Sequence, residues 1–411
     1  MRLMYRYTLA ALMLTNASMA NAAMFVDYVH VAGAQCIGTS INDSGQAVGN
    51  CLLPSASANN VPWVATAPGG SLQPLAALVS GQPCRVGGIT NSGWIVGDCS
   101  DASNIEFSVI WSTSNPGTTP TKLNPLPRTL LFPLLRPADV QTHAITLSQQ
   151  GAVLAQSISA SGNQTVVLYI PGSGTPIRIS TFGDNCAGID VNSTLIYGYP
   201  SLLMNCLGTN AKPVPTVATR GVSGYNLNVL PVPTDASYCL AAGMNDQSQI
   251  VGTCVFPDSD DHVPQTAFWA TPSSLPKLLT LPLNAKNQGI AINNAGHILA
   301  RRGDSTGIPQ NLFWGDPKDS FGIRPIVPLP GSITTKAVDF AHNDTIVLTC
   351  ENSAQYTTAC TWTPDEGTQA LAPINGGLKS QLTSISPTGK FVVGGTTDTA
   401  QNINAAAATL F

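Results

Sequence analysis

The sequence predicts an all-β fold, a β-propeller of eight four-stranded blades that the N- and C-terminal strands close into a ring. Three observations carry this prediction. A strand–turn–strand unit recurs eight times, at spacings of 43 to 58 residues. Each copy leads into two further short strands, and the two ends of the chain supply complementary parts of one blade. Four short strands in a period of about 40–50 residues are typical of a propeller blade.

The first 22 residues read as a secretory signal peptide. Arg2 and Arg6 precede an apolar run, which closes on the cleavage pattern Ala20-Asn21-Ala22. We therefore expect cleavage near Ala22 and a mature chain, residues 23–411, that folds as one propeller domain. The predicted location is secreted or periplasmic. No later run of about 18 apolar residues occurs, so membrane insertion is not expected.

Composition narrows the class of protein. The net charge is −4, only 10% of residues are charged, and there is no basic tract. These features argue against nucleic acid and anionic membrane surfaces as partners. Three glutamates in the whole chain leave little from which to build long exposed helices. Gly, Pro, Ser, Thr and Asn between short Val/Ile/Leu runs indicate short strands joined by turns.

The best-preserved copy of the repeat is residues 36–51, with a cysteine at each end of a predicted hairpin. A four-residue loop, Asn42-Asp43-Ser44-Gly45, flanked by Ile41 and Gln46, places Cys36 opposite Cys51. Opposed strand residues have Cα atoms roughly 4.5–5.5 Å apart, within the window of about 4.4–6.8 Å that a disulfide tolerates. The same register predicts three bonds: Cys36–Cys51, Cys84–Cys99 and Cys239–Cys254.

The remaining four cysteines complete five predicted disulfides. Cys350 and Cys360 flank a predicted hairpin around Ala354 and Gln355, and Cys186–Cys206 is the remainder, across an irregular insertion. Ten cysteines in an exported chain indicate an oxidising compartment. Because no C-x-x-C pair occurs, a zinc site is not expected, and we predict no other metal ligand and no cofactor.

The eight copies align on the turn and on the end of the third strand. The turn anchors are Gly45, Gly93, Gly151, Thr194, Ser248, Gly296, Thr345 and Gly389. The third strand ends on an aromatic residue in most copies: Trp63, Trp111, Tyr169, Trp269, Trp314 and Trp362, with Val217 in the fourth copy and Phe411 in the eighth. These rings either stack on sugars or pack between neighbouring blades. We favour packing, because one strand position repeated in every blade is typical of the core.

The ends of the chain predict how the ring closes. The last copy stops after its third strand, at Leu410-Phe411. The mature N-terminus begins with a lone strand around residues 25–29, which has no hairpin of its own. The surplus strand fits the vacancy in the last blade, and closure removes sheet edges that would otherwise favour aggregation.

Three short motifs resemble a known family. They are an Ile-Asn-x-x-Gly turn, a Val-Gly strand end and an Ala-Phe-Trp strand, as in Thr266-Ala267-Phe268-Trp269 and, less closely, Asn311-Leu312-Phe313-Trp314. With this spacing the chain resembles the bacterial extracellular repeats called the HAF family, along nearly all of its mature length. The resemblance implies an exported bacterial protein with a propeller-like fold. It implies no particular reaction.

Two sets of polar residues are candidate ligand sites. The turn asparagines either form a ring of ligand oxygens or serve the turns themselves, because Asn side chains bond their own backbone there; they are Asn42, Asn91, Asn245, Asn293 and Asn343. We favour the turn role. The acidic loop at residues 258–262 lacks the calcium-binding pattern of an EF-hand. We favour a solvated loop over a calcium site there.

Enzyme motifs are absent from the sequence. It contains no G-x-S-x-G elbow, no H-E-x-x-H and no phosphate- or dinucleotide-binding glycine loop. The five histidines occupy unlike repeat positions, and we assign no catalytic residue. Propeller glycosidases need only two carboxylates, which different blades can supply. The candidates on or beside strands are Asp27, Asp98, Asp190 and Asp339.

The function most consistent with these features is an interaction module that binds a glycan or a protein at one face of the ring, as a monomer. The alternative is a propeller-type glycoside hydrolase or polysaccharide lyase, and a structural role in the cell envelope ranks third. Binding should reside in the connections that differ most between copies: residues 101–106, 124–140, 199–213 and 256–264. Residues 124–140 are unusually apolar. They either fold onto the ring or mark a partner surface.

Overall fold

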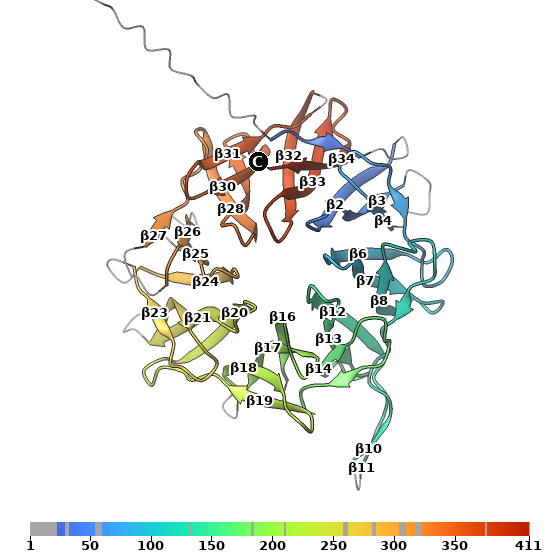
Figure 1. Cartoon of the computed structure of the whole chain (residues 1–411), viewed down its shortest axis with the longest axis vertical. Helices are drawn as coiled ribbons and strands as arrows, with labels where there is room; N and C mark the ends of the chain where they lie inside the picture. The colour runs from blue at the N-terminus through green and yellow to red at the C-terminus, as the bar shows by residue number, and fades with distance from the viewer. Residues whose placement is uncertain are drawn as a thin grey trace, which may run out of the picture.

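The chain folds into a ring of eight antiparallel four-stranded sheets, as the computed structural model shows (Figure 1). The structure describes residues 23–28, 33–53, 60–131, 134–181, 185–208, 211–257, 262–281, 285–303, 310–317, 322–374 and 376–410. No helix occurs within these ranges. The predicted eight-bladed propeller is confirmed. The predicted signal peptide, residues 1–22, lies outside the described part.

In each blade the first strand lies nearest the centre of the ring and the fourth lies at the rim (Figure 1). Blade 1 contains β2 (Gln35–Ile41), β3 (Ala47–Leu52), β4 (Asn60–Ala65) and β5 (Gln73–Pro74). Blade 2 contains β6 (Cys84–Ile89), β7 (Trp94–Ser100), β8 (Glu106–Ser112) and β9 (Thr121–Lys122). Blade 3 contains β12 (Gln141–Leu147), β13 (Val153–Ile158), β14 (Gln164–Tyr169) and β15 (Ile177–Arg178). Blade 4 contains β16 (Ala187–Ile196), β17 (Tyr199–Leu207), β18 (Pro213–Arg220) and β19 (Tyr225–Val229).

The second half of the ring repeats this arrangement. Blade 5 contains β20 (Tyr238–Met244), β21 (Ile250–Pro257), β22 (His262–Trp269) and β23 (Lys277–Leu279). Blade 6 contains β24 (Asn287–Ile292), β25 (Ile298–Arg302), β26 (Gln310–Trp314) and β27 (Ile323–Pro325). Blade 7 contains β28 (Ser332–Phe340), β29 (Ile346–Asn352), β30 (Thr357–Thr363) and β31 (Gly367–Leu371). Blade 8 takes β32 (Gly376–Ile385), β33 (Phe391–Asp398) and β34 (Ile403–Thr409) from the C-terminus.

The N-terminus supplies the fourth strand of blade 8. Strand β1 (Val26–Asp27) pairs antiparallel with β34, Val26 opposite Ala407. The flanking residues Phe25 and Tyr28 are both buried, Phe25 among residues of blades 7 and 8 and Tyr28 beside the ring of Trp63 in blade 1. The predicted closure of the ring by both termini is therefore confirmed.

Every first strand carries a one-residue bulge, which corrects the predicted hairpin geometry. In blade 1 the pairing shifts between Gly38 and Ser40, so that Cys36 faces Cys51 while Ile41 faces Ala47 rather than Gln46. The loop is one residue longer than predicted, and the bulge adds one residue to the first strand. The two differences cancel at the cysteines, so the predicted cysteine pairing holds. Equivalent shifts occur in the other seven blades and locally increase strand twist.

The bulge also explains the Val-Gly pattern of four copies, which was expected at the end of the second strand but lies inside it. A Cβ on Gly49 would lie 2.1 Å from the carbonyl oxygen of Ile37, and one on Gly97 would lie 2.1 Å from that of Arg85. The bulged first strand brings its carbonyl against the neighbouring backbone. Only a residue without a side chain fits this approach without a shift of the strands.

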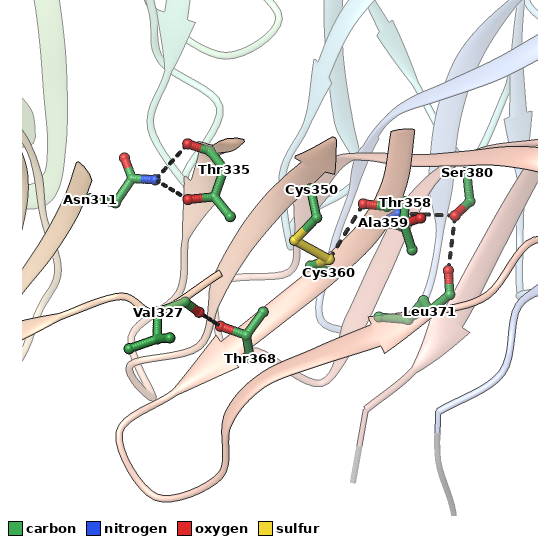
Figure 2. Close-up of a disulfide and its surroundings, with 10 residues drawn as sticks. All are labelled: Asn311, Val327, Thr335, Cys350, Thr358, Ala359, Cys360, Thr368, Leu371 and Ser380. Atoms are coloured by element: carbon green, nitrogen blue, oxygen red, sulfur yellow. Dashed lines mark hydrogen bonds between the residues drawn. A yellow bond between two sulfur atoms is a disulfide. The ribbon is translucent and has the colours of Figure 1, made fainter. Parts of the chain in front are cut away.

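All five predicted disulfides are present. Four join the beginning of a first strand to the end of the second: Cys36–Cys51, Cys84–Cys99, Cys186–Cys206 and Cys239–Cys254, with Cα atoms 4.1, 4.1, 3.9 and 4.0 Å apart. The fifth, Cys350–Cys360, joins the second and third strands of blade 7 (Figure 2). Its cysteines are diagonal rather than opposed, with Cα atoms 6.2 Å apart. The turn between them, closed by the amide of Gln355 on the Asn352 carbonyl, lies where it was predicted.

Two turn anchors were wrong. In blade 4 the first strand continues past Thr194 to Ile196, and the turn is Tyr197-Gly198, both with positive φ. Consequently residues 199–207 are the second strand β17 rather than part of a divergent connection, and only residues 208–212 connect β17 to β18. The two-residue Tyr-Gly turn was missed because this hairpin is longer than the others. In blade 7 the residue with positive φ is Asp344, not Thr345.

The repeated aromatic residues form the cores between blades. Four of them face the first residue of their second strand, namely Tyr169, Trp269, Trp314 and Trp362, and Trp111 holds the equivalent position opposite Ile95, the second residue of β7. Trp63 lies two residues earlier in its strand, over Gly49. In blades 4 and 8 the position that the other aromatic residues share is held by Ala218 and Ala408, not by Val217 and Phe411. Phe411 lies outside the described residues. All six rings are buried, so they cannot stack on sugars, and the packing interpretation is confirmed.

Candidate functional site

The winding of the blades gives the ring two different faces. Turns between strands 1 and 2 and between strands 3 and 4 lie on one face, which we call the turn face. Connections between strands 2 and 3, and from strand 4 to the next blade, lie on the other. Four disulfides join strand 1 to strand 2 near this second face, which we call the disulfide face.

A closed circuit of hydrogen bonds runs around the turn face. In most turns the second residue donates its backbone N–H to the side chain of the corresponding residue in the next blade. The circuit runs from Asp43 to Asn91, Gln149, Ser193, Asp246, Asn294, His342 and the Pro387 carbonyl, and Thr388 returns it to the carboxylate of Asp43. Each junction between blades is thus tied by at least one polar contact.

This circuit decides between the two interpretations of the turn asparagines. The Oδ1 atom of Asn42 accepts the N–H groups of Ser44 and Gln46 at 3.1 and 3.0 Å, and its Nδ2 donates to the carbonyl of Thr90 in the next blade at 3.0 Å. Asn245 and Asn293 are buried and bonded in the same way. Their oxygens are engaged in the turns, as favoured, so they do not form a ring of ligand oxygens.

Asn91 and Asn343 differ from those three. Asn91 holds the second turn position, where its Nδ2 donates to Asp43 at 2.6 Å. Asn343 holds the third position, and its Oδ1 accepts the amide of Thr345 at 3.2 Å. The sequence alignment placed all five asparagines in one set, whereas the turn geometry divides them into three positions.

Two of the four candidate aspartates are partly buried and hydrogen-bond to the next blade. Asp190 and Asp339 occupy the residue after the bulge in blades 4 and 7, and each accepts a backbone amide of the next blade, Met244 at 2.9 Å and Ile385 at 3.0 Å. Burial raises the pKa of Asp190 to about 6, although these amide hydrogen bonds oppose the shift. Burial also raises the pKa of Asp339. Both side chains are used by the scaffold.

The other two aspartates also interact with side chains close to them in the fold. Asp98 in blade 2 accepts the hydroxyl of Ser108 at 2.8 Å and pairs with Arg85 at 3.3 Å. His143 of blade 3 lies 3.9 Å from the same carboxylate. Asp27 at the rim of blade 8 accepts the hydroxyl of Thr396. The four candidates lie in blades 2, 4, 7 and 8, each engaged with its own neighbours, and are not brought together as an acid/base pair.

The apolar insertion between blades 2 and 3 forms an arm that starts at the disulfide face and projects beyond the rim (Figure 1). Strands β10 (Thr129–Leu131) and β11 (Leu134–Arg136) pair as a hairpin whose backbone extends away from the ring (Figure 1). Its root is fixed in blade 3. Buried Asp139 pairs with Arg136 at 2.7 Å and accepts the hydroxyl of Ser157 at 2.6 Å. The insertion is therefore anchored at its base and does not fold back over the ring.

Residues 258–261 of the acidic loop lie outside the described part of the chain. Within the described ranges, no group of three or more His, Cys, Asp or Glu side chains is placed to hold a metal ion. The same ranges contain no helix long and apolar enough to cross a membrane.

Two small hollows open between blades near the disulfide face, and sequence reasoning found neither. One, of about 180 Å³, lies between blades 3 and 4 and is lined by residues that include Asn163, Gln164 and Asn185. The other, of about 80 Å³, lies between blades 7 and 8 beside Lys379 and Gln381. Each is assembled from two blades, so no single repeat carries its pattern.

Comparison with known proteins places the chain by fold alone. No family model and no curated protein sequence matches it. Its fold is similar to the β-propeller domain of the Trilobed protease from Pyrococcus furiosus (TM-score 0.51, 10% identity, 83% of this chain and 99% of that one). It is also similar to prolyl oligopeptidase B from Galerina marginata, bound to a 35mer substrate (TM-score 0.56, 11% identity), where the match covers 90% of this chain and 54% of the other. The acylaminoacyl peptidase of Pyrococcus horikoshii gives TM-score 0.51 at 11% identity over 86% of this chain and 55% of the peptidase. At these identities the likeness establishes a β-propeller and nothing about activity.

Proposed function

We propose that this protein is an exported interaction module that binds a partner protein on its disulfide face. The observation that carries the proposal is that the divergent connections between blades converge on that face, while the turn face is a closed hydrogen-bond circuit built on one repeated plan. Scaffolds that bind partners vary in their loops and keep their framework. The five disulfides indicate an oxidising compartment.

The β10–β11 arm favours a protein over a glycan. Its sequence holds Leu130, Leu131, Leu134 and Leu135, and its backbone leaves the ring from an anchored root. Contiguous apolar segments on a soluble scaffold are typical of protein contact surfaces. The repeated aromatic residues, which would have suited sugar stacking, are buried in the cores. Export, and membership of the HAF family, remain part of the proposal.

Replacement of the arm tests this function. Residues 128–135 are exchanged for a short Gly-Asn turn in the mature chain, which keeps the Arg136–Asp139 pair at the root. A matched control shortens the turn-face loop at residues 113–119. Wild type and both variants are screened for binding to envelope and secreted proteins of the source cell and to glycan arrays, and for turnover of glycosidase substrates. We expect protein binding that only the arm replacement abolishes, with unchanged melting temperature. Glycan binding, or turnover lost on changing a single aspartate, would contradict the proposal.

A further inference from the structure

The rim of blade 4 differs from the rim of the other blades. A fourth strand has one free edge, and proteins protect such edges by keeping them short or by placing Pro or charged residues on them. Six of the eight outer strands have two or three residues, and each contains a proline or a charged residue: β1, β5, β9, β15, β23 and β27. Only β19 and β31 are longer, with five residues each, and they contain no proline and no charged residue.

The edge of β31 is tied to the neighbouring blade. The hydroxyl of Thr368 donates to the carbonyl of Val327, which follows the outer strand of blade 6 (Figure 2). Arg324 in that outer strand donates to the carbonyl of Pro364, just before β31. Strand β19 has no such tie among the described residues, and its sequence Tyr-Asn-Leu-Asn-Val is uncharged throughout.

The register of β19 shows which of its backbone groups are free. The amide of Leu230 donates to the carbonyl of Pro215, and the amide of Gly221 donates to the carbonyl of Gly224. Because antiparallel pairs alternate between bonded and non-bonded, these two bonds place Asn226 and Asn228 in bonded pairs with β18. Tyr225, Leu227 and Val229 therefore direct their N–H and C=O groups away from the sheet. No described residue hydrogen-bonds to these outward groups.

The side chains beside this edge suit an apolar strand. Leu227 is 37% exposed and Val229 is 61% exposed, on the same face of the strand because they are two residues apart. At the turn-face end, the guanidinium of Arg220 stacks 4.5 Å from the ring centre of Tyr199 and 5.7 Å from that of Tyr225. No carboxylate among the described residues pairs with Arg220. Tyr and Arg are the residues most often found at the energetic centres of protein contacts.

We propose that β19 is a docking edge, at which an extended segment of a partner protein adds a fifth strand to blade 4. The segment carries apolar side chains over Leu227 and Val229 and an acidic group at the end that reaches Arg220. This mode of recognition takes its affinity from main-chain hydrogen bonds and its specificity from alternate side chains. The site lies at the rim, so it does not depend on the proposed role of the disulfide face.

A partner segment fits this edge better than a second copy of the chain. Two rings would meet convex rim against convex rim, with contact confined to two five-residue strands of about 17 Å. Such a contact falls short of the roughly 1,200 Å² that stable protein pairs bury. An extended segment follows the edge along its length and also reaches the Tyr199–Arg220–Tyr225 stack.

The test uses the mature chain and a synthetic ten-residue peptide of alternating valine and threonine that ends in glutamate. Amide hydrogen exchange, read residue by residue by NMR, should slow on peptide addition at Tyr225, Leu227 and Val229. It should not change at Asn226 and Asn228, whose amides already bond to β18. This alternating pattern is specific to strand addition, because unspecific contact with the rim would not follow the register.

Two matched variants locate the site. Leu227→Lys gives β19 the charge that other outer strands carry, and we expect about tenfold weaker peptide binding. Ala370→Lys makes the same change on β31 and should alter binding less than about twofold. Replacing the terminal glutamate by lysine should weaken binding to wild type but not to Arg220→Gln. Circular dichroism checks that each variant is folded.

Three results would overturn the proposal. They are no change in exchange at millimolar peptide, equal loss of binding in the Leu227→Lys and Ala370→Lys variants, and protection of the three amides by self-association without peptide. The last result would make a second copy of the chain the occupant of the edge.

Discussion

Closure of the ring by the N-terminal strand rests on one side chain that can be tested against its neighbour. Phe25 is 4% exposed and packs among residues of blades 7 and 8, whereas adjacent Met24 is 73% exposed. Truncation of a buried Phe to Ala costs about 3–5 kcal/mol. At an end of the chain, where the site can relax, we expect the lower limit, about 3 kcal/mol. Met24→Ala should change the unfolding free energy by less than about 0.5 kcal/mol.

The assay is urea unfolding of residues 23–411, followed by tryptophan fluorescence and far-UV circular dichroism. Hydrogen exchange of β34 adds a local readout. Because Val26 and Asp27 pair with Ala407 and Ala406, loss of Phe25 should speed exchange in β34 and leave blade 4 unchanged. Deletion of residues 23–28 should in addition expose the edge of β34 and promote self-association. Equal midpoints for Phe25→Ala and Met24→Ala, with unchanged exchange in β34, would refute this account of closure.

Two further predictions concern the scaffold. Replacing Cys239 and Cys254 together by serine removes a bond that closes a loop of about 16 residues, and urea unfolding should show a loss of about 3 kcal/mol; an unchanged midpoint would contradict this. Burial raises the pKa of Asp190 to about 6 from 3.8, so its contribution to stability is complete below pH 3.8 and declines as pH rises through 6. The unfolding free energy of Asp190→Asn relative to that of wild type should accordingly rise by about 2–3 kcal/mol between pH 4 and pH 7. A difference that does not depend on pH would show that the Asp190 carboxyl does not titrate in this range.

The local rules of the repeat were visible in the sequence because they act within one hairpin. Turn residues such as Gly45, cysteines at both ends of a strand pair and small apolar strands each reflect contacts between residues close in the chain. These signals predicted the blade, the disulfides and, from the unequal ends of the chain, the closure. The bulge escaped notice because a loop one residue longer than predicted compensates for it, so that Cys36 still faces Cys51.

Contacts between blades could be decided only by the tertiary structure. Which atoms the side chains of Asn42, Asp190 and Asp339 meet depends on the neighbouring blade, about 50 residues away in the chain for each of the three. The sequence could name these residues as candidates but could not show that the scaffold uses them. The free edge of β19 likewise follows from its register with β18 and from the lack of hydrogen bonds between any described residue and its outward backbone groups. The contacts between blades and the free edge of β19 are both properties of the assembled ring. An edge can be recognised as unpaired only when the hydrogen-bond partners of all the other strands are known.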